Sequence, residues 1–453
     1  MKKPLPLALA SLLALALGAC GGSGPEPSAA APSTIDASSR LTASGPVAGE
    51  VIVQLNSGVD VAAIESAYGL RVIDRFGLRP IWRLRLPTTA TLDPTVEALR
   101  ADSRILFAEP NFESETPEGR RRTVWATGGD AGLWVSQWAP ASVRLGDALT
   151  VSRGAGIRVA VLDTGIDLSH PALAGRLARR GDGSLLGRDF VDDDGDPSEV
   201  GVGTDPGYGH GTHVAGLVAL TAPDATLMPV RVLDRAGRGN VWVLAEALAW
   251  AVDPDGDPLT DDAAHVINLS LGTTQPTQLL RTVVSLASCD FDDDDDEFDD
   301  AGFDDDRARC DRKHAAVVLS AAGNDGSDTE RLYPAAETVP GALAVTAHTR
   351  DRTLASFANR GPWVQIAAPG DALISTFPGG GYATWSGTSM ASPLAAGAAA
   401  LVLATYADPR SVLPLDITQR LVARSAALCS SPLRRLDTAA AVRDASAPEL
   451  ACP

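Results

Sequence analysis

The sequence is poor in basic residues, in cysteine and in long apolar runs, and each shortage argues against a class of protein. It holds 38 Lys and Arg against 57 Asp and Glu, which gives a formal net charge of -19. That charge repels phosphates, so no nucleic-acid partner is expected. None of the 5 cysteines has the C-x-x-C spacing of many zinc and redox sites. An apolar run over residues 5–17 is too short to cross a membrane.

What the sequence does hold suits a large α/β domain. At 453 residues, the chain is long enough for one large domain and a smaller one. Hydrophobic residues make up 45% of it, and there are 43 glycines. We therefore expect a buried, mostly parallel sheet joined by tight turns.

The first residues read as an export signal followed by a tether. Two lysines precede the apolar run, which ends in the letters LGAC. This order predicts a signal peptide over residues 1–19. LGAC resembles a bacterial lipobox, which implies lipidation of Cys20 after cleavage; an ordinary signal cleaved nearby is the alternative. Residues 20–46 are rich in Gly, Ser, Pro and Ala and predict a flexible tether.

An even set of cysteines remains once Cys20 is set aside. In an exported protein, such a set suggests two disulfides. Neighbours in the sequence give the pairs Cys289–Cys310 and Cys429–Cys452. Two other connectivities are left open.

Three polar residues stand in small-residue motifs. Ser389, in GTSMASP, begins an Ala-rich helical run, where free N–H groups and the helix dipole favour negative charge. A serine there is more often a cap than a nucleophile, so Ser389 needs partners. Asp163 follows an apolar run and precedes Thr-Gly, as at the carboxyl tip of a buried parallel strand. His210 lies in GHGTHVAG, which leads into another apolar helix. The order Asp, His, Ser is one in which serine-hydrolase triads occur.

These segments resemble those of the subtilisin family of serine peptidases, and the likeness covers residues 134–445. It implies a three-layer α/β fold with a mostly parallel sheet. A fourth segment, SAAGNDG, follows the strand-like residues 315–319 and carries Asn324 where the family has its oxyanion asparagine. Taken alone, Asn324 would be an ordinary turn residue.

The resemblance also implies the chemical roles. Ser389 would attack the scissile carbonyl, His210 would carry the proton to the leaving amine, and Asp163 would orient the imidazole. The amide of Asn324 and the backbone N–H of Ser389 would donate to the oxyanion. No organic cofactor is needed. His213, one turn after His210, is interpreted as structural.

Three further segments resemble the family's substrate-binding elements. Two would pair with an extended protein or peptide substrate, gaining main-chain hydrogen bonds; for the first, a plain loop is the alternative. The third lines the base of the first specificity pocket, which we expect to be shallow and apolar because a leucine stands where many relatives have a smaller residue. The residues are Gly237, Arg238 and Gly239, then Ser270, Leu271 and Gly272, and finally Leu332.

A smaller domain is predicted over residues 47–115, where the sequence has a β-α-β-β-α-β rhythm. It resembles the ferredoxin-like α+β propeptide that inhibits many members of the family; a permanent accessory domain is the alternative. Residues 116–132, with three consecutive arginines, would hold the processing cut, and the peptidase domain would span 133–453. Because the lipid anchor precedes the cut, maturation would release the enzyme from the membrane. We expect a monomer.

Several acidic segments are candidate calcium-binding loops. Calcium bound there would stabilise the fold and would take no part in catalysis. One loop partly resembles calcium loops but lacks their terminal glutamate, and a turn with exposed charges is the alternative. Its aspartates are Asp253, Asp255, Asp257 and Asp261. The aspartates at residues 189–196 suit calcium, but no complete set of ligands can be traced, and a solvated acidic loop is the favoured alternative. The insertion at 289–310 includes 12 carboxylates, without which the formal charge would be -7, and it is interpreted as a solvated loop. A silent surface protein that binds calcium or a basic ligand is the competing function, and the four catalytic-type residues argue against it.

Overall fold

The computed structural model describes residues 44–120, 126–257, 260–289, 314–449 and 451–452. The predicted signal peptide, Cys20 and nearly all of the predicted tether lie outside these ranges, as does Cys310. Within them, no helix is long and apolar enough to cross a membrane.

The first described segment forms the predicted β-α-β-β-α-β unit, with antiparallel pairing throughout. Its elements are β1 (Pro46–Leu55), α1 (Val61–Tyr68), β2 (Arg71–Arg75), β3 (Ile81–Arg85), α2 (Leu92–Arg100) and β4 (Ile105–Glu115). Alternate residues of β1, Val51 and Val53, pack with Leu84 of β3 and Leu99 of α2 in a separate small core. The strand order is β2-β3-β1-β4-β9, so β4 lies at the edge where a strand from the next domain joins.

The larger sheet has nine strands in the order β16-β17-β13-β12-β11-β10-β6-β8-β7. Every neighbouring pair is parallel except β16 and β17. The strands are β6 (Arg158–Asp163), β7 (Arg188–Asp189), β8 (Thr226–Arg231), β10 (Val266–Leu269), β11 (Val317–Ala321), β12 (Ala342–His348), β13 (Ile366–Pro369), β16 (Ala426–Ala427) and β17 (Arg434–Arg435). The expected α/β architecture with a mostly parallel sheet is confirmed.

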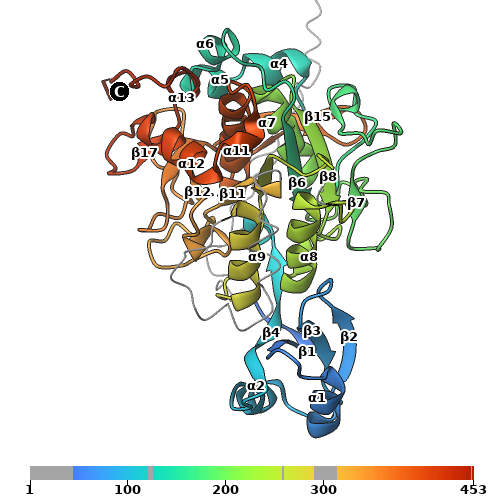
Figure 1. The fold of residues 1–453 in the computed structure, drawn as a ribbon. Coiled ribbons are helices and arrows are strands. Elements are labelled where there is room, and N and C mark those ends of the chain that lie inside the picture. Colours follow the sequence, from blue (N-terminus) through green and yellow to red (C-terminus); the bar gives the residue numbers. More distant parts are fainter. Residues whose placement is uncertain (1–43, 121–125, 258–259, 290–313, 450, 453) are drawn as a thin grey trace, which may run out of the picture. The chain divides into compact units, whose positions relative to one another are not determined.

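Helices cover both faces of this sheet, which makes three layers (Figure 1). They are α7 (His210–Thr221) and α11 (Thr388–Leu403) on one face and α8 (Val241–Val252) and α9 (Gln278–Ser288) on the other. Strand β6 shows why its run of apolar residues is continuous. Val159 and Val161 pack with α7 and α11, whereas Ala160 and Leu162 pack with α8 and α9. A strand buried on both faces has no side that must be polar.

The remaining elements are short or lie at the margins of the peptidase domain. They are α3 (Pro117–Arg120), β5 (Ala126–Thr127), α4 (Ala131–Ser136), α5 (Trp138–Ser142), α6 (Leu145–Leu149), β9 (Arg238–Asn240), β14 (Leu373–Phe377), β15 (Gly381–Trp385), α12 (Pro414–Ala423) and α13 (Thr438–Arg443). Strands β14, β15 and β5 form a small antiparallel sheet.

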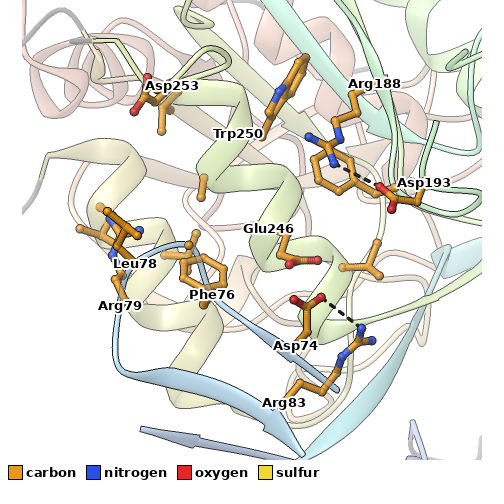
Figure 2. Close-up of a pocket in the computed structure, with 18 of the residues that line it drawn as sticks. Asp74, Phe76, Leu78, Arg79, Arg83, Arg188, Asp193, Glu246, Trp250 and Asp253 are labelled. Carbon is orange, nitrogen blue, oxygen red and sulfur yellow. Dashed lines mark hydrogen bonds and ion pairs between the residues drawn. The ribbon is translucent and has the colours of Figure 1, made fainter. Parts of the chain in front are cut away.

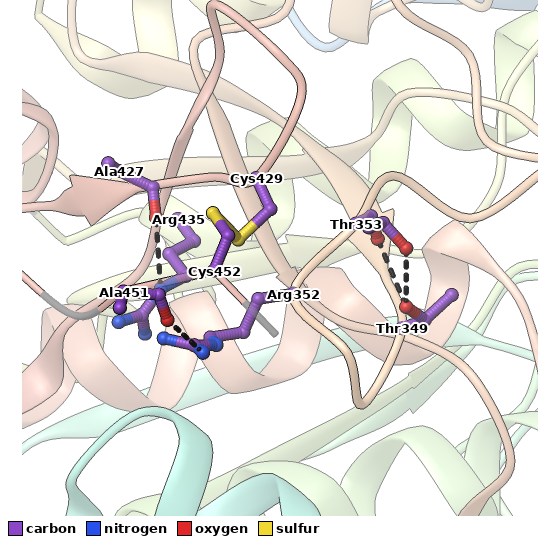
Figure 3. Close-up of a disulfide and its surroundings, with 8 residues drawn as sticks. All are labelled: Thr349, Arg352, Thr353, Ala427, Cys429, Arg435, Ala451 and Cys452. Atoms are coloured by element: carbon purple, nitrogen blue, oxygen red, sulfur yellow. Dashed lines mark hydrogen bonds between the residues drawn. A yellow bond between two sulfur atoms is a disulfide. The ribbon is translucent and has the colours of Figure 1, made fainter.

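A disulfide ties the C-terminal segment to the peptidase domain (Figure 3). Cys429 and Cys452 are joined with an S–S distance of 2.13 Å, which is the pairing expected from their sequence order. Arg352 donates a 2.6 Å hydrogen bond to the carbonyl of Ala451 beside it. Residues 451 and 452 are therefore held by a charged hydrogen bond and a covalent bond.

Candidate active site

Four elements bring the predicted catalytic side chains together. Asp163 ends β6, His210 begins α7, Ser389 lies in the first turn of α11 and Asn324 follows β11. All four are at most 2% exposed. Because parallel strands end at the same edge of a sheet, the strand tips and the two helix starts meet there.

Asp163 and His210 are held in direct contact. His210 Nδ1 lies 2.7 Å from Asp163 Oδ1, so the carboxylate fixes the orientation of the ring. The close approach of His210 to Asp163 depends on Gly211, since a Cβ there would overlap the carbonyl oxygen of Gly165. The glycine after the histidine is thus explained by close packing of α7 against the turn after β6.

The charge state of His210 is set by competing effects. Burial alone would lower the pKa of its imidazole, but the adjacent carboxylates of Asp163 and Glu118 outweigh burial and raise the pKa to about 10. Both carboxylates therefore favour the protonated form of the ring.

His213 lies on the next turn of α7 and has a different environment. Its Nε2 lies 3.2 Å from the carbonyl of Leu373 and 3.1 Å from that of Ala383, at the two strands β14 and β15. Burial and the charge of His210 lower its pKa to about 3, so it is neutral. These contacts agree with a structural role.

Asn324 is oriented by the residue that precedes Ser389. Its Oδ1 accepts hydrogen bonds of 2.9 Å from both the backbone N–H and the hydroxyl of Thr388. The amide group Nδ2 is thereby turned toward the space above Ser389. Sequence reasoning missed Thr388, although it stands inside the motif.

The two predicted substrate strands flank an extended segment of this same chain. Residues 113–115 of β4 pair antiparallel with β9, where Ser114 faces Gly239 and Glu115 faces Arg238. On the other side, the backbone groups of Glu115 and Gly272 exchange hydrogen bonds of 2.9 and 3.0 Å. The backbone N–H of Thr116 then donates to the carbonyl of Gly237 at 3.2 Å. Residues 113–116 therefore form the middle strand of a three-stranded arrangement that leads to Ser389.

The second predicted substrate strand lies close to the predicted nucleophile. Ser389 Oγ is 3.3 Å from the carbonyl of Ser270, and Ser270 Oγ donates to the carbonyl of Ser389 at 2.9 Å. Leu332 is buried, and a Cβ added to Gly272 would lie 2.7 Å from Leu332 Cγ. Leu332 thus fills space directly against Gly272, whereas Leu271 is part of the core beneath.

Two side chains of β4 cap helices of the peptidase domain. The carboxylate of Glu109 accepts hydrogen bonds from the backbone N–H groups of Gln278 and Leu279 at the start of α9. Asn111 Oδ1 accepts one from Trp242 at the start of α8. Burial raises the pKa of Glu109 to about 7. The sequence analysis had not singled out these contacts, and a carboxylate at a helix N-terminus is a stabilising arrangement.

Glu118, which the sequence analysis also missed, is 7% exposed and touches three of the four predicted catalytic residues. Its Oε2 accepts a 2.6 Å hydrogen bond from Ser389 Oγ and lies 3.1 Å from His210 Nε2. Its Oε1 accepts a 2.8 Å hydrogen bond from Asn324 Nδ2. A side-chain carboxylate thus lies between the nucleophile, the base and the oxyanion donor.

The predicted calcium loops contain arginine partners instead of a gathered carboxylate cluster. Asp261 pairs with Arg410 at 2.9 Å, and Arg231 lies 2.5 Å from carboxylate oxygens of both Asp189 and Asp192. Asp255 accepts from the backbone N–H of Asp257 within its own loop. In the part of the chain that the structure describes, no three His, Cys, Asp or Glu side chains are grouped to hold a metal ion.

A cavity of about 930 Å³ is lined by none of the predicted catalytic residues (Figure 2). Its wall combines β2 and β3, through Asp74 and Arg83, with α8, through Glu246 and Trp250. Burial and the charge of Asp74 raise the pKa of Glu246 to about 7. The chemistry of the four converging residues, and not the size of this cavity, identifies the candidate active site.

Comparison with known proteins gives matches over both domains. A model of the subtilase family matches residues 154–443, and a model of the fervidolysin N-terminal prodomain matches residues 32–111. A thermophilic serine proteinase from Bacillus sp. (strain AK1) is 33% identical over 371 residues, 79% of this chain and 78% of the relative. Thermitase from Thermoactinomyces vulgaris is 34% identical over 276 residues, 59% of this chain and 81% of the relative. A cold-adapted subtilisin-like serine proteinase of known structure has 29% identity and a TM-score of 0.49, covering 63% of this chain and 90% of that one.

Proposed function

We infer that this chain, which belongs to the subtilase family and is a subtilisin-like serine endopeptidase with an N-terminal prodomain, acts through Asp163, His210 and Ser389. The observation that carries this proposal is the meeting of these residues with Asn324 at the end of the groove that holds residues 113–116. A binding protein would have no need of this combination.

In the proposed reaction, Ser389 Oγ attacks the scissile carbonyl carbon while its proton passes to His210 Nε2. Asp163 stabilises the imidazolium that forms. The oxyanion receives hydrogen bonds from Asn324 Nδ2 and the backbone N–H of Ser389. The C–N bond then breaks as His210 gives its proton to the leaving amine. Water next attacks the acyl-enzyme while His210 accepts a proton from it. The ester bond breaks as His210 returns a proton to Ser389 Oγ.

The substrate is proposed to be an extended protein segment that replaces residues 113–116 between β9 and residues 270–272. Main-chain pairing of this kind demands little of the sequence bound. Selectivity would come from the specificity pocket beside Gly272, which Leu332 would make shallow and apolar because its buried side chain lies against Gly272. Arg238 is exposed and would select only weakly.

We propose that the prodomain is an inhibitor removed by self-cleavage within residues 116–132. The pairing of residues 113–116 with the substrate strands supports this proposal. Export, lipidation at Cys20 and release on maturation are proposed from the sequence alone. Asp261, one of the predicted calcium ligands, is paired with Arg410 instead, and no step of the reaction depends on calcium.

Hydrolysis of a denatured protein tests the proposed nucleophile. The protein is compared with the Ser389→Ala and Ser386→Ala variants after an added peptidase has removed the N-terminal segment from all three and has itself been removed, because Ser389→Ala is not expected to process itself. Ser386 is the matched control, since it lies on the same turn but bonds to Asp371 and the backbone of Ala372. We expect loss of activity only in Ser389→Ala; equal activity in all three would overturn the assignment of Ser389.

A further inference from the structure

We propose that the side-chain carboxylate of Glu118 is the group that silences the catalytic centre of the precursor, as an internal ligand of Ser389, His210 and Asn324. This proposal rests on the proposed function, because it assumes that these three residues are catalytic. It goes further by assigning the silencing of the catalytic residues themselves to one side chain, in addition to the backbone pairing of residues 113–116 with the substrate strands.

The first argument is the position of the two carboxylate oxygens. Oε1 takes the hydrogen bond from Asn324 Nδ2 that the oxyanion would use, at 2.8 Å. Oε2 accepts a hydrogen bond from Ser389 Oγ, at 2.6 Å. A Cβ at Gly387 would overlap Oε1, so the glycine before Thr388 leaves the space that the carboxylate fills. The carboxylate therefore blocks the place where a substrate carbonyl would be polarised.

The second argument is the proton on His210. This ring lies between two carboxylates, Asp163 on Nδ1 and Glu118 on Nε2. Two negative neighbours favour the imidazolium, which cannot accept the proton of Ser389. The other histidine nearby, His213, is neutral, so it adds no positive charge that would disfavour the imidazolium of His210. The base is thus disabled in addition to the oxyanion site.

The third argument is the path of the backbone. Residues 113–116 are paired as an extended strand, but at Pro117 the chain enters the short helix α3. The backbone N–H of Gly119 turns back to the carbonyl of Thr116 at 3.0 Å. An extended backbone is what presents a peptide carbonyl to Ser389, so this turn presents a carboxylate side chain in its place.

The test uses the full-length precursor and diisopropyl fluorophosphate, a small probe of serine nucleophiles. A Ser389 Oγ–P bond forms, the P–F bond breaks, fluoride leaves and the serine proton passes to His210. The mass added to the intact precursor gives the rate of labelling. Glu118→Gln keeps the shape without the charge, and Glu118→Ala removes the side chain. Glu113→Gln is the matched control, because Glu113 is an exposed glutamate of the preceding strand β4.

We expect both Glu118 variants to be labelled about 10- to 100-fold faster than the unmodified precursor, as for the loss of one or two charged hydrogen bonds. Glu113→Gln should be labelled at the unmodified rate. Equal rates for all four precursors, together with rapid labelling of the processed enzyme, would overturn the role of Glu118 while leaving Ser389 as the nucleophile. Absence of labelling even after processing would instead contradict the proposed function.

A second measurement covers a precursor that cleaves itself before it can be labelled. In the Ser389→Ala background, the ¹⁵N chemical shifts of the His210 ring report its protonation directly. We expect His210 to stay an imidazolium at pH 8 and to titrate at lower pH once Glu118→Gln is added, whereas Glu113→Gln should change nothing. An unchanged titration in the Glu118 variant would contradict the proposal.

Discussion

At the scale of single residues, the candidate site is a set of mutually oriented polar groups. Asp163 fixes the ring of His210, and Thr388 fixes the amide of Asn324. Because these bonds exist before any substrate arrives, the donors need not reorganise when charge develops on the substrate carbonyl. Substitutions at these residues should therefore change turnover far more than binding.

Asn324→Ala is expected to lower kcat by about 100- to 1,000-fold with little change in KM. The physical reason is that the amide Nδ2 donates to the oxyanion only as the tetrahedral intermediate forms. Steady-state kinetics of the processed enzyme on a peptide substrate measures both constants. A rise in KM at constant kcat would show that Asn324 serves binding instead.

Leu332→Gly is expected to enlarge the pocket next to Gly272. The ratio of kcat/KM for a substrate with Phe before the scissile bond to one with Ala there should rise by about 10- to 200-fold, the usual effect of pocket size. Matched peptides that differ only at that residue provide the measurement. A ratio that does not move would show that Leu332 does not limit the pocket.

At the scale of elements, strand β4 connects the two domains. It contributes to the prodomain core, caps α9 and α8 through Glu109 and Asn111, and continues as the middle strand between β9 and Gly272. Contacts of β4 with the peptidase domain therefore begin well before residue 118. Substitution of Glu109 or Asn111 should therefore weaken the association of the prodomain with the peptidase domain.

The raised pKa of Glu109 makes a pH-dependent contribution. Folding raises this pKa from 4.5 to about 7, so the folded state binds more protons between these values. Stability from this group is thus full below pH 4.5 and falls as the pH rises to 7, by up to about 3 kcal/mol. Thermal unfolding of the full-length Ser389→Ala chain at pH 5 and 8 measures the fall.

Glu109→Gln should make that fall smaller, because the amide does not ionise, whereas Glu113→Gln should leave it unchanged. The same pH dependence in all three chains would assign the fall to other buried carboxyl groups, such as Glu199 and Glu337, whose pKa values burial also raises to about 7.

At the scale of the whole molecule, the sequence predicted the sheet class, the two domains and the residues that meet at the sheet edge. The sheet class is confirmed, and the motifs behind all of these predictions stand where packing restricts the residue type. Gly211 is one example, because any Cβ would overlap the carbonyl of Gly165. The buried strand β6 is another, because both of its faces are covered.

The contacts that the sequence did not predict join polar residues far apart in the chain. Glu118 lies 271 residues before Ser389. It stands in a polar segment of the sequence, where nothing distinguishes it from a solvent-exposed glutamate. Arg410 reaches Asp261 across 149 residues, and the acidic loop by itself looked like a calcium ligand set. Local patterns carry no information about such partners, so only the folded chain shows them.

The central claim is that this chain is a serine endopeptidase that processes itself through Ser389. The most direct test is intact mass of the purified full-length precursor beside its Ser389→Ala variant, incubated under the same conditions. The account predicts that only the unmodified chain loses its N-terminal segment, with the new terminus within residues 116–132. Identical processing of both chains, or none in either together with no hydrolysis of a denatured protein, would contradict it.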